Sequence, residues 1–81
     1  MVLADERILE FLDEHEVGTA KEMAESNTVR FSRSYITQRS GKLVDYGLIR
    51  LLGNGVFVIT EVGEQYLEGE LDAQELESDG D

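Results

Sequence analysis

The sequence predicts a small α+β fold, and three features indicate it. Residues 31–60 read as one helix followed directly by two strands, which flank the turn tripeptide Gly53-Asn54-Gly55. Two helical patterns precede this stretch, and one follows it. The predicted order is helix, short strand, helix, helix, strand, strand, helix. This is the order of a winged helix-turn-helix, with a three-helix core, a β-hairpin wing and a C-terminal helix.

The length of 81 residues allows one domain with one small core. We expect this domain to span residues 1–70, followed by an acidic tail over residues 71–81. The chain has no Cys and one His, too few ligands for a typical zinc site. No stretch is apolar enough for a signal peptide or a membrane span. We therefore expect a soluble, cytoplasmic protein with no metal, no cofactor and no evident small-molecule substrate.

The chain is strongly acidic, with 18 Asp and Glu against 7 Lys and Arg and a formal net charge of −11. One interpretation is a protein that avoids or mimics nucleic acid. The other is adaptation to molar salt, where dense carboxylates keep the surface hydrated. Only two of the basic residues are Lys, which favours the second interpretation and a halophilic origin.

The basic residues are concentrated in one segment. Residues 30–50 hold five Lys and Arg against one carboxylate, a net charge of about +4, whereas the rest of the chain holds two against seventeen, about −15. Basic residues that are concentrated on one helix and its hairpin are typical of a nucleic-acid-binding surface.

The first helix is predicted over residues 5–16 and ends before Gly18. Residues Val17 and Gly18 are expected to add a short strand to the hairpin. Thr19 and Glu22 form a capping box that opens a second, short helix. The inner faces of the two helices are predicted to be Ile8, Leu9, Phe11, Leu12, Ala20, Met23 and Ala24.

The central helix is predicted to begin after the N-cap Ser32 and to end near Gly47. Its inner side contains Ile36, Ser40 and Leu43, and its outer side is polar. Gly41, on the outer side, costs about 1 kcal/mol relative to Ala. Either a DNA backbone approaches closely there or the glycine has a packing role.

The hairpin strands are predicted over residues 48–52 and 56–59. Alternation places Phe57 and Ile59 on one face and Val56 and Val58, expected to be exposed, on the other. Thr60 is expected to cap the last helix, whose inner stripe is predicted to be Val62, Tyr66 and Leu67.

About 70 residues of the sequence resemble the small winged-helix DNA-binding proteins of halophilic archaea that are similar to the phage phiH repressor. The motifs that carry the resemblance are Ser32-Arg33-Ser34-Tyr35, Lys42-Leu43-Val44-Asp45-Tyr46-Gly47-Leu48-Ile49, Ile59-Thr60-Glu61-x-Gly63 and Tyr66-Leu67-Glu68-Gly69-Glu70-Leu71. The resemblance implies a repressor or regulator that binds double-stranded DNA. It places Ser32, Arg33, Ser34 and Thr37 at the start of a recognition helix, and Arg50 and Asn54 on the wing.

The chemistry of these side chains suggests a role for each of them. Arg33 and Gln38 match guanine and adenine edges, and Ser34 or Thr37 matches either kind. Lys42, Arg30 and Arg50 are better placed for phosphates. Arg39 either joins this surface or pairs with an acid of the first helix, and Tyr35 either stacks on sugar-phosphate or packs.

The predicted function is therefore a sequence-specific, double-stranded DNA-binding transcriptional regulator that acts as a repressor. The alternative is a winged-helix module for protein–protein interaction in a transcription or replication assembly, favoured by Val56 and Val58. No arrangement of Ser, His and Asp indicates an enzyme.

A homodimer is expected, because one recognition helix covers too few base pairs. Its interface is predicted to lie on the first and last helices and to include Phe11, Leu71 and Leu76.

We predict that the melting temperature rises between about 0.1 M and 2 M KCl, because the Debye length falls to a few ångströms and repulsion among the carboxylates is screened. Thermal unfolding followed by circular dichroism measures this directly. A melting temperature that stays constant or falls would contradict the halophilic interpretation.

Overall fold

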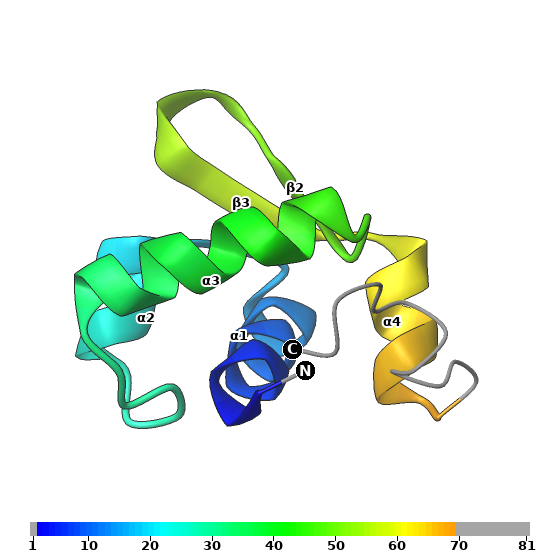
Figure 1. The fold of residues 1–81 in the computed structure, drawn as a ribbon, viewed down its shortest axis with the longest axis horizontal. Helices are drawn as coiled ribbons and strands as arrows, with labels where there is room; N and C mark the ends of the chain where they lie inside the picture. The colour runs from blue at the N-terminus through cyan, green and yellow to red at the C-terminus, as the bar shows by residue number, and fades with distance from the viewer. Residues whose placement is uncertain (1, 70–81) are drawn as a thin grey trace.

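The computed structural model describes residues 2–69, within which four helices pack against a three-stranded antiparallel sheet (Figure 1). The chain order confirms the predicted winged helix-turn-helix. The elements are α1 (Leu3–His15), β1 (Val17–Thr19), α2 (Ala20–Glu25), α3 (Arg33–Asp45), β2 (Ile49–Leu51), a single 3-10 turn η1 (Gly53–Gly55), β3 (Val56–Ile59) and α4 (Glu61–Leu67).

The predicted caps set the ends of the helices. The Thr19 hydroxyl accepts from the Glu22 amide at 3.1 Å, and the Glu22 carboxylate accepts from the Thr19 amide at 2.9 Å, which completes the capping box. Ser32 accepts from the amide of Tyr35 and so caps α3. Gly47 follows α3 with a φ of 78°, the left-handed conformation that commonly ends a helix. Helix α1 begins at Leu3, two residues earlier than predicted.

The sheet has the order β1-β3-β2, so that β3 is its central strand. Val58 pairs with Val17 of β1 on one side and with Arg50 of β2 on the other. The prediction that Val56 and Val58 are exposed was wrong. Both are half-buried, because the strand that carries them has a neighbour on each side.

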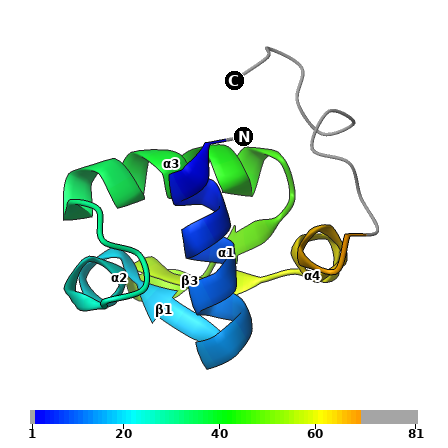
Figure 2. The same ribbon diagram turned by 90° about the horizontal axis from the view of Figure 1, so that it is seen from below.

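Helix α1 lies at the centre of the domain, with α2, α3 and α4 around it and the sheet behind (Figure 2). The buried core contains Ile8, Leu9, Phe11, Leu12, Met23, Val29, Ile36, Leu43, Leu48, Ile49 and Phe57. In α4, Tyr66 and Leu67 pack against this core as predicted, but Val62 is exposed and Gly63 is buried in its place. A Cβ at Gly63 would collide with the Leu48 carbonyl oxygen, so only glycine lets α4 approach this closely.

Phe11 packs over Gly18 of β1. A Cβ added to Gly18 would lie 2.6 Å from a ring carbon of Phe11, which explains the glycine within a strand. Phe11 is therefore 93% buried in its own domain (7% exposed), and the prediction that it contributes to a dimer interface was wrong. The two other apolar residues predicted for that interface, Leu71 and Leu76, lie outside the described residues.

A buried ion pair joins α1 to α3. The Arg39 guanidinium donates from Nε to Oδ1 of Asp5 at 2.9 Å and from Nη2 to Oδ2 at 2.7 Å. Asp5 is fully buried, and Arg39 is 7% exposed. Of the two interpretations of Arg39, pairing with an acid of the first helix is confirmed. Because both oxygens and two nitrogens are engaged, the pair fixes orientation as well as distance.

We predict that Asp5→Ala lowers the free energy of unfolding by about 3–5 kcal/mol, because it leaves the buried Arg39 without this carboxylate. The double variant Asp5→Leu/Arg39→Met should regain most of the loss, because it removes both charges from the interior. Urea unfolding in concentrated KCl measures both. A loss below about 1 kcal/mol, typical of an exposed pair, would show that the contact has no structural role.

Candidate nucleic-acid interface

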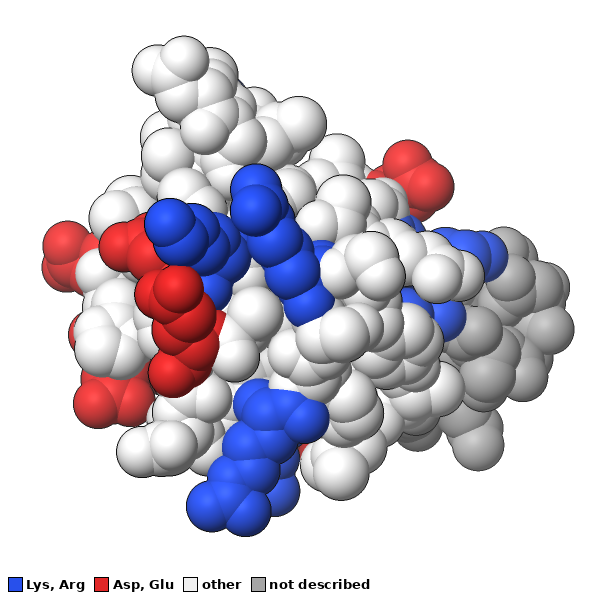
Figure 3. All heavy atoms as spheres, turned by 90° about the vertical axis from the view of Figure 1, so that its left-hand side faces the viewer, with Lys and Arg blue, Asp and Glu red and all other residues white. Residues whose placement is uncertain are grey.

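Basic side chains gather at the end of the molecule where α2 and α3 begin, beneath the wing (Figure 3). Arg39 is turned inward to Asp5, so four of the five basic residues in residues 30–50 lie at the surface: Arg30, Arg33, Lys42 and Arg50. The part of the wing seen in this view carries no charge, and acidic side chains lie toward the edges of the view, most of them on the left. The segregation of charge in the sequence thus corresponds to a segregation in space.

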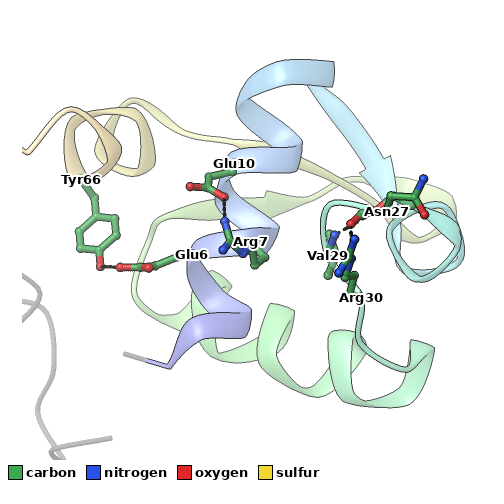
Figure 4. A network of polar contacts seen from close by, with 8 residues as sticks. Glu6, Arg7, Glu10, Asn27, Val29, Arg30 and Tyr66 are labelled. Atoms are coloured by element: carbon green, nitrogen blue, oxygen red, sulfur yellow. Dashed lines mark hydrogen bonds and ion pairs between the residues drawn. The ribbon is translucent and has the colours of Figure 1, made fainter.

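The turn between α2 and α3 places Arg30 at the entrance of α3. Val29 is buried and anchors the turn, while the Ser26 hydroxyl accepts from the Val29 amide at 3.2 Å. Arg30 has a φ of 62°, and its Nε donates to the carbonyl oxygen of Asn27 at 2.9 Å (Figure 4). This hydrogen bond holds the base of the guanidinium, while the side chain stays exposed.

The outer side of α3 is polar, as predicted. Its exposed residues are Arg33, Ser34, Thr37, Gln38, Gly41 and Asp45; Ser32, at the N-cap, is also exposed, and Lys42 is half-buried. The Thr37 hydroxyl donates to the Arg33 carbonyl oxygen at 2.9 Å, which leaves its lone pairs available to accept. Tyr35 is half-buried with its ring 5.5 Å from that of Phe31, in agreement with packing.

A hollow of about 450 Å³ lies between α3 and the wing. It brings together three predicted site residues, Arg33, Thr37 and Asn54, from two elements that are far apart in the sequence. Its other lining residues are Thr19, Ala20, Lys21, Leu51, Gly55 and Phe57. The hollow is thus polar along the helix, apolar along the strand, and basic at the end nearest α2.

Two residues of this hollow, Lys21 and Leu51, were missed from the sequence. The capping box at Thr19 fixes Lys21 in the first turn of α2, but only the packing of α2 against α3 brings it to the same hollow as Arg33. Leu51 belongs to an apolar strand pattern that predicts a core residue. It is 56% exposed because β2 extends beyond the core at this point.

Arg50 does not join this hollow. Successive residues of a strand point to opposite faces of the sheet, so Arg50 lies on the face opposite to Leu51, with its partner Val58. Asn54, at the tip of the wing, has a φ of 67°, a left-handed conformation that asparagine tolerates. Of the two predicted wing residues, Asn54 therefore faces α3 across the hollow, whereas Arg50 extends from the other side of the wing.

The turn-linked helices α2 and α3, with a hairpin beside the second helix, define a winged helix-turn-helix protein. The sequence profile of the winged helix-turn-helix phage repressor family matches residues 1–79, and the chain belongs to this family of DNA-binding regulators. A similar solved structure is that of the PhiH1 repressor-like protein from Haloarcula marismortui. It is 46% identical, with a TM-score of 0.86, over 90% of this chain and 83% of that one. The comparison with curated proteins finds no match.

Residues 2–69 contain neither a metal-binding cluster nor a membrane-spanning helix. No group of three or more His, Cys, Asp or Glu side chains there is arranged to hold a metal ion. No helix in this part of the chain has the length and apolar character needed to cross a membrane.

Proposed function

We propose that this protein binds duplex DNA sequence-specifically through α3 and the wing and acts as a transcriptional repressor. The observation that carries the proposal is the hollow that Arg33, Thr37 and Asn54 line together, at the end of the molecule where the basic side chains gather. Membership of the phage repressor family and the likeness to a repressor-like protein support it. A chromosomal target would place the protein in the cytoplasm.

The side chains divide into those suited to bases and those suited to phosphates. Arg33 and Gln38 extend from the exposed side of α3 and match guanine and adenine edges in the major groove, while Ser34 and Thr37 match either kind. The phosphate-directed set contains Arg30, Lys42 and Arg50, to which the structure adds Lys21. Ser32 lies at the N-cap, where the amides of α3 also favour a phosphate.

The overall charge of −11 limits how much affinity can come from electrostatics. Affinity from counterion release falls steeply with salt concentration, and few basic residues are present to supply it. Hydrogen bonds to base edges and apolar contacts from Leu51 then contribute a larger share. We therefore expect binding that is selective for sequence and depends only weakly on salt concentration.

The second candidate function is a protein-interaction module. The sequence favoured it because of Val56 and Val58, whereas the structure favours it because of two other apolar residues of the wing. Val56 and Val58 are half-buried, but Leu51 and Leu52 of the wing are 56% and 42% exposed. Exposed apolar side chains beside a polar helix suit a protein partner as well as the sugars of DNA.

Affinity selection from random duplexes at about 2 M KCl, where non-specific electrostatic binding is weak, separates the two functions. Enrichment of one sequence supports the repressor, and its absence supports the protein module.

We predict that Arg33→Ala weakens binding to the selected duplex by roughly 1–3 kcal/mol and relaxes one position of the site, because it removes a contact to a base edge. Lys42→Ala should weaken binding to all duplexes about equally, because a phosphate contact does not depend on sequence. Fluorescence anisotropy at fixed KCl concentration measures both. Unchanged binding by both variants would exclude this face of α3 as the DNA-binding surface.

We also propose a homodimer, since two recognition helices about 34 Å apart would read successive major grooves. With Phe11 buried, the exposed apolar side chains of α1 and α4 within the described residues are Leu3 and Val62. Sedimentation equilibrium at tens of micromolar protein, in concentrated KCl, should give twice the monomer mass, and the selected site should be palindromic. A monomer that selects a site without repeated halves would contradict the dimer.

A further inference from the structure

Gly41 occupies the interior of α3, and nothing among the described residues requires a glycine there. A glycine at such a position destabilises a helix relative to alanine. A Cβ built at Gly41 would meet no atom within 4 Å, and its φ is not positive. The packing role considered for this residue is therefore excluded among residues 2–69.

The other described glycines show how unusual this is. Gly18 and Gly63 have no room for a side chain, and Gly47, Gly55 and Gly69 have positive φ angles. Gly53 is open like Gly41, but it lies in the turn of the wing, where no helix is weakened. Among the described glycines, Gly41 is thus the one that weakens a helix without relieving a clash or an unfavourable φ.

The position of Gly41 on the helix shows what it leaves open. Ser34 lies seven residues earlier, two turns away and nearly on the same line along the helix. Arg39 and Leu43, two positions before and after Gly41, are both buried on the opposite side. Gly41 therefore lies at the middle of the outer side of α3. The short side chain of Ser34 and the missing side chain of Gly41 lie on one line along the helix.

Two pairs of longer side chains flank this line. The spacing of 100° per residue places Arg33 and Thr37 on one flank, and both line the hollow that faces the wing. It places Gln38 and Lys42 on the other flank. The outer side of α3 thus has a low centre between two polar ridges, a shape that suits a helix lying with its centre against the floor of a groove.

We propose that Gly41 is the point of closest approach between α3 and duplex DNA, an inference that rests on the proposed function. Without a side chain there, the helix backbone can lie about 3 Å closer to the edges of the base pairs. The flanking pairs then reach toward the two walls of the major groove, Arg33 and Thr37 on the side of the wing. The carboxylate of Asp45, one turn further along, marks where the helix leaves the groove.

The test compares Gly41→Ala with Ser40→Ala, which places the same side chain one residue earlier in the same helix. Ser40 is fully buried, and its hydroxyl has no hydrogen-bond partner among the described residues, so the control changes the inside of α3 and leaves its outer side intact. The full chain is used at fixed KCl concentration. Its melting temperature is measured together with its affinity for the selected duplex and for a scrambled one.

Gly41→Ala should raise the melting temperature by about 4–8 °C, because it removes a helical glycine from a small domain. It should nevertheless weaken binding to the selected duplex by about tenfold or more, the cost of one lost base-pair contact, with little change for the scrambled duplex. Gly41→Leu should keep the fold and lose specific binding altogether. Ser40→Ala should leave both affinities unchanged.

A Gly41→Ala variant that is more stable and binds the selected duplex as well as the parent would overturn the inference, and so would a variant that is less stable. If the parent protein selects no duplex at all, the proposed function fails first. If the parent binds and the variant binds equally, only the role of Gly41 fails.

Discussion

The buried pair between Asp5 and Arg39 determines how α3 lies across the domain, and the candidate interface depends on that orientation. A hydrophobic contact alone would allow α3 to rotate or slide on α1, because apolar packing is not directional. Two parallel hydrogen bonds of 2.9 and 2.7 Å between a fully buried carboxylate and a guanidinium fix one arrangement. With Arg39 held inward, Ser34 and Gly41 must point outward. Arg39 is thus lost to the basic surface, but its pairing with Asp5 orients the residues on the outer side of α3.

A protein with a net charge of −11 is repelled overall by a polyanion such as DNA, so its basic residues must be concentrated where the DNA binds. The arrangement found here keeps four basic residues of residues 30–50 at the surface, near α3 and the wing, and leaves the part of the wing seen in Figure 3 uncharged. In concentrated salt, charge–charge attraction beyond a few ångströms is screened, whereas hydrogen bonds and apolar contacts act at short range. Close fit then matters more than net charge. An unencumbered glycine on α3 and an exposed Leu51 on the wing are features that improve close fit.

Local chemistry made much of the fold predictable from the sequence. The capping residues Thr19 and Ser32 and the turn at residues 53–55 act over a few residues, so their patterns identified the elements and their order. Contacts between distant residues were harder to predict. The burial of Phe11 depends on the space above Gly18, and the exposure of Leu51 depends on where the wing leaves the core. The same limit applies to the site. Exposure of the α3 residues followed from helical periodicity, whereas the position of Lys21 in the hollow lined by Arg33, and that of Arg50 on the far side of the wing, required the tertiary structure.

We propose that the outer side of α3 and the near side of the wing form one surface for duplex DNA. Amide chemical-shift mapping by NMR, with the selected duplex titrated into isotope-labelled protein in concentrated KCl, tests it most directly. We predict the largest changes along Ser34, Thr37 and Gly41 and at Asn54, with small changes in the interior of α1. Changes centred on α4 or on the face of the sheet that carries Val58, with α3 unaffected, would contradict it.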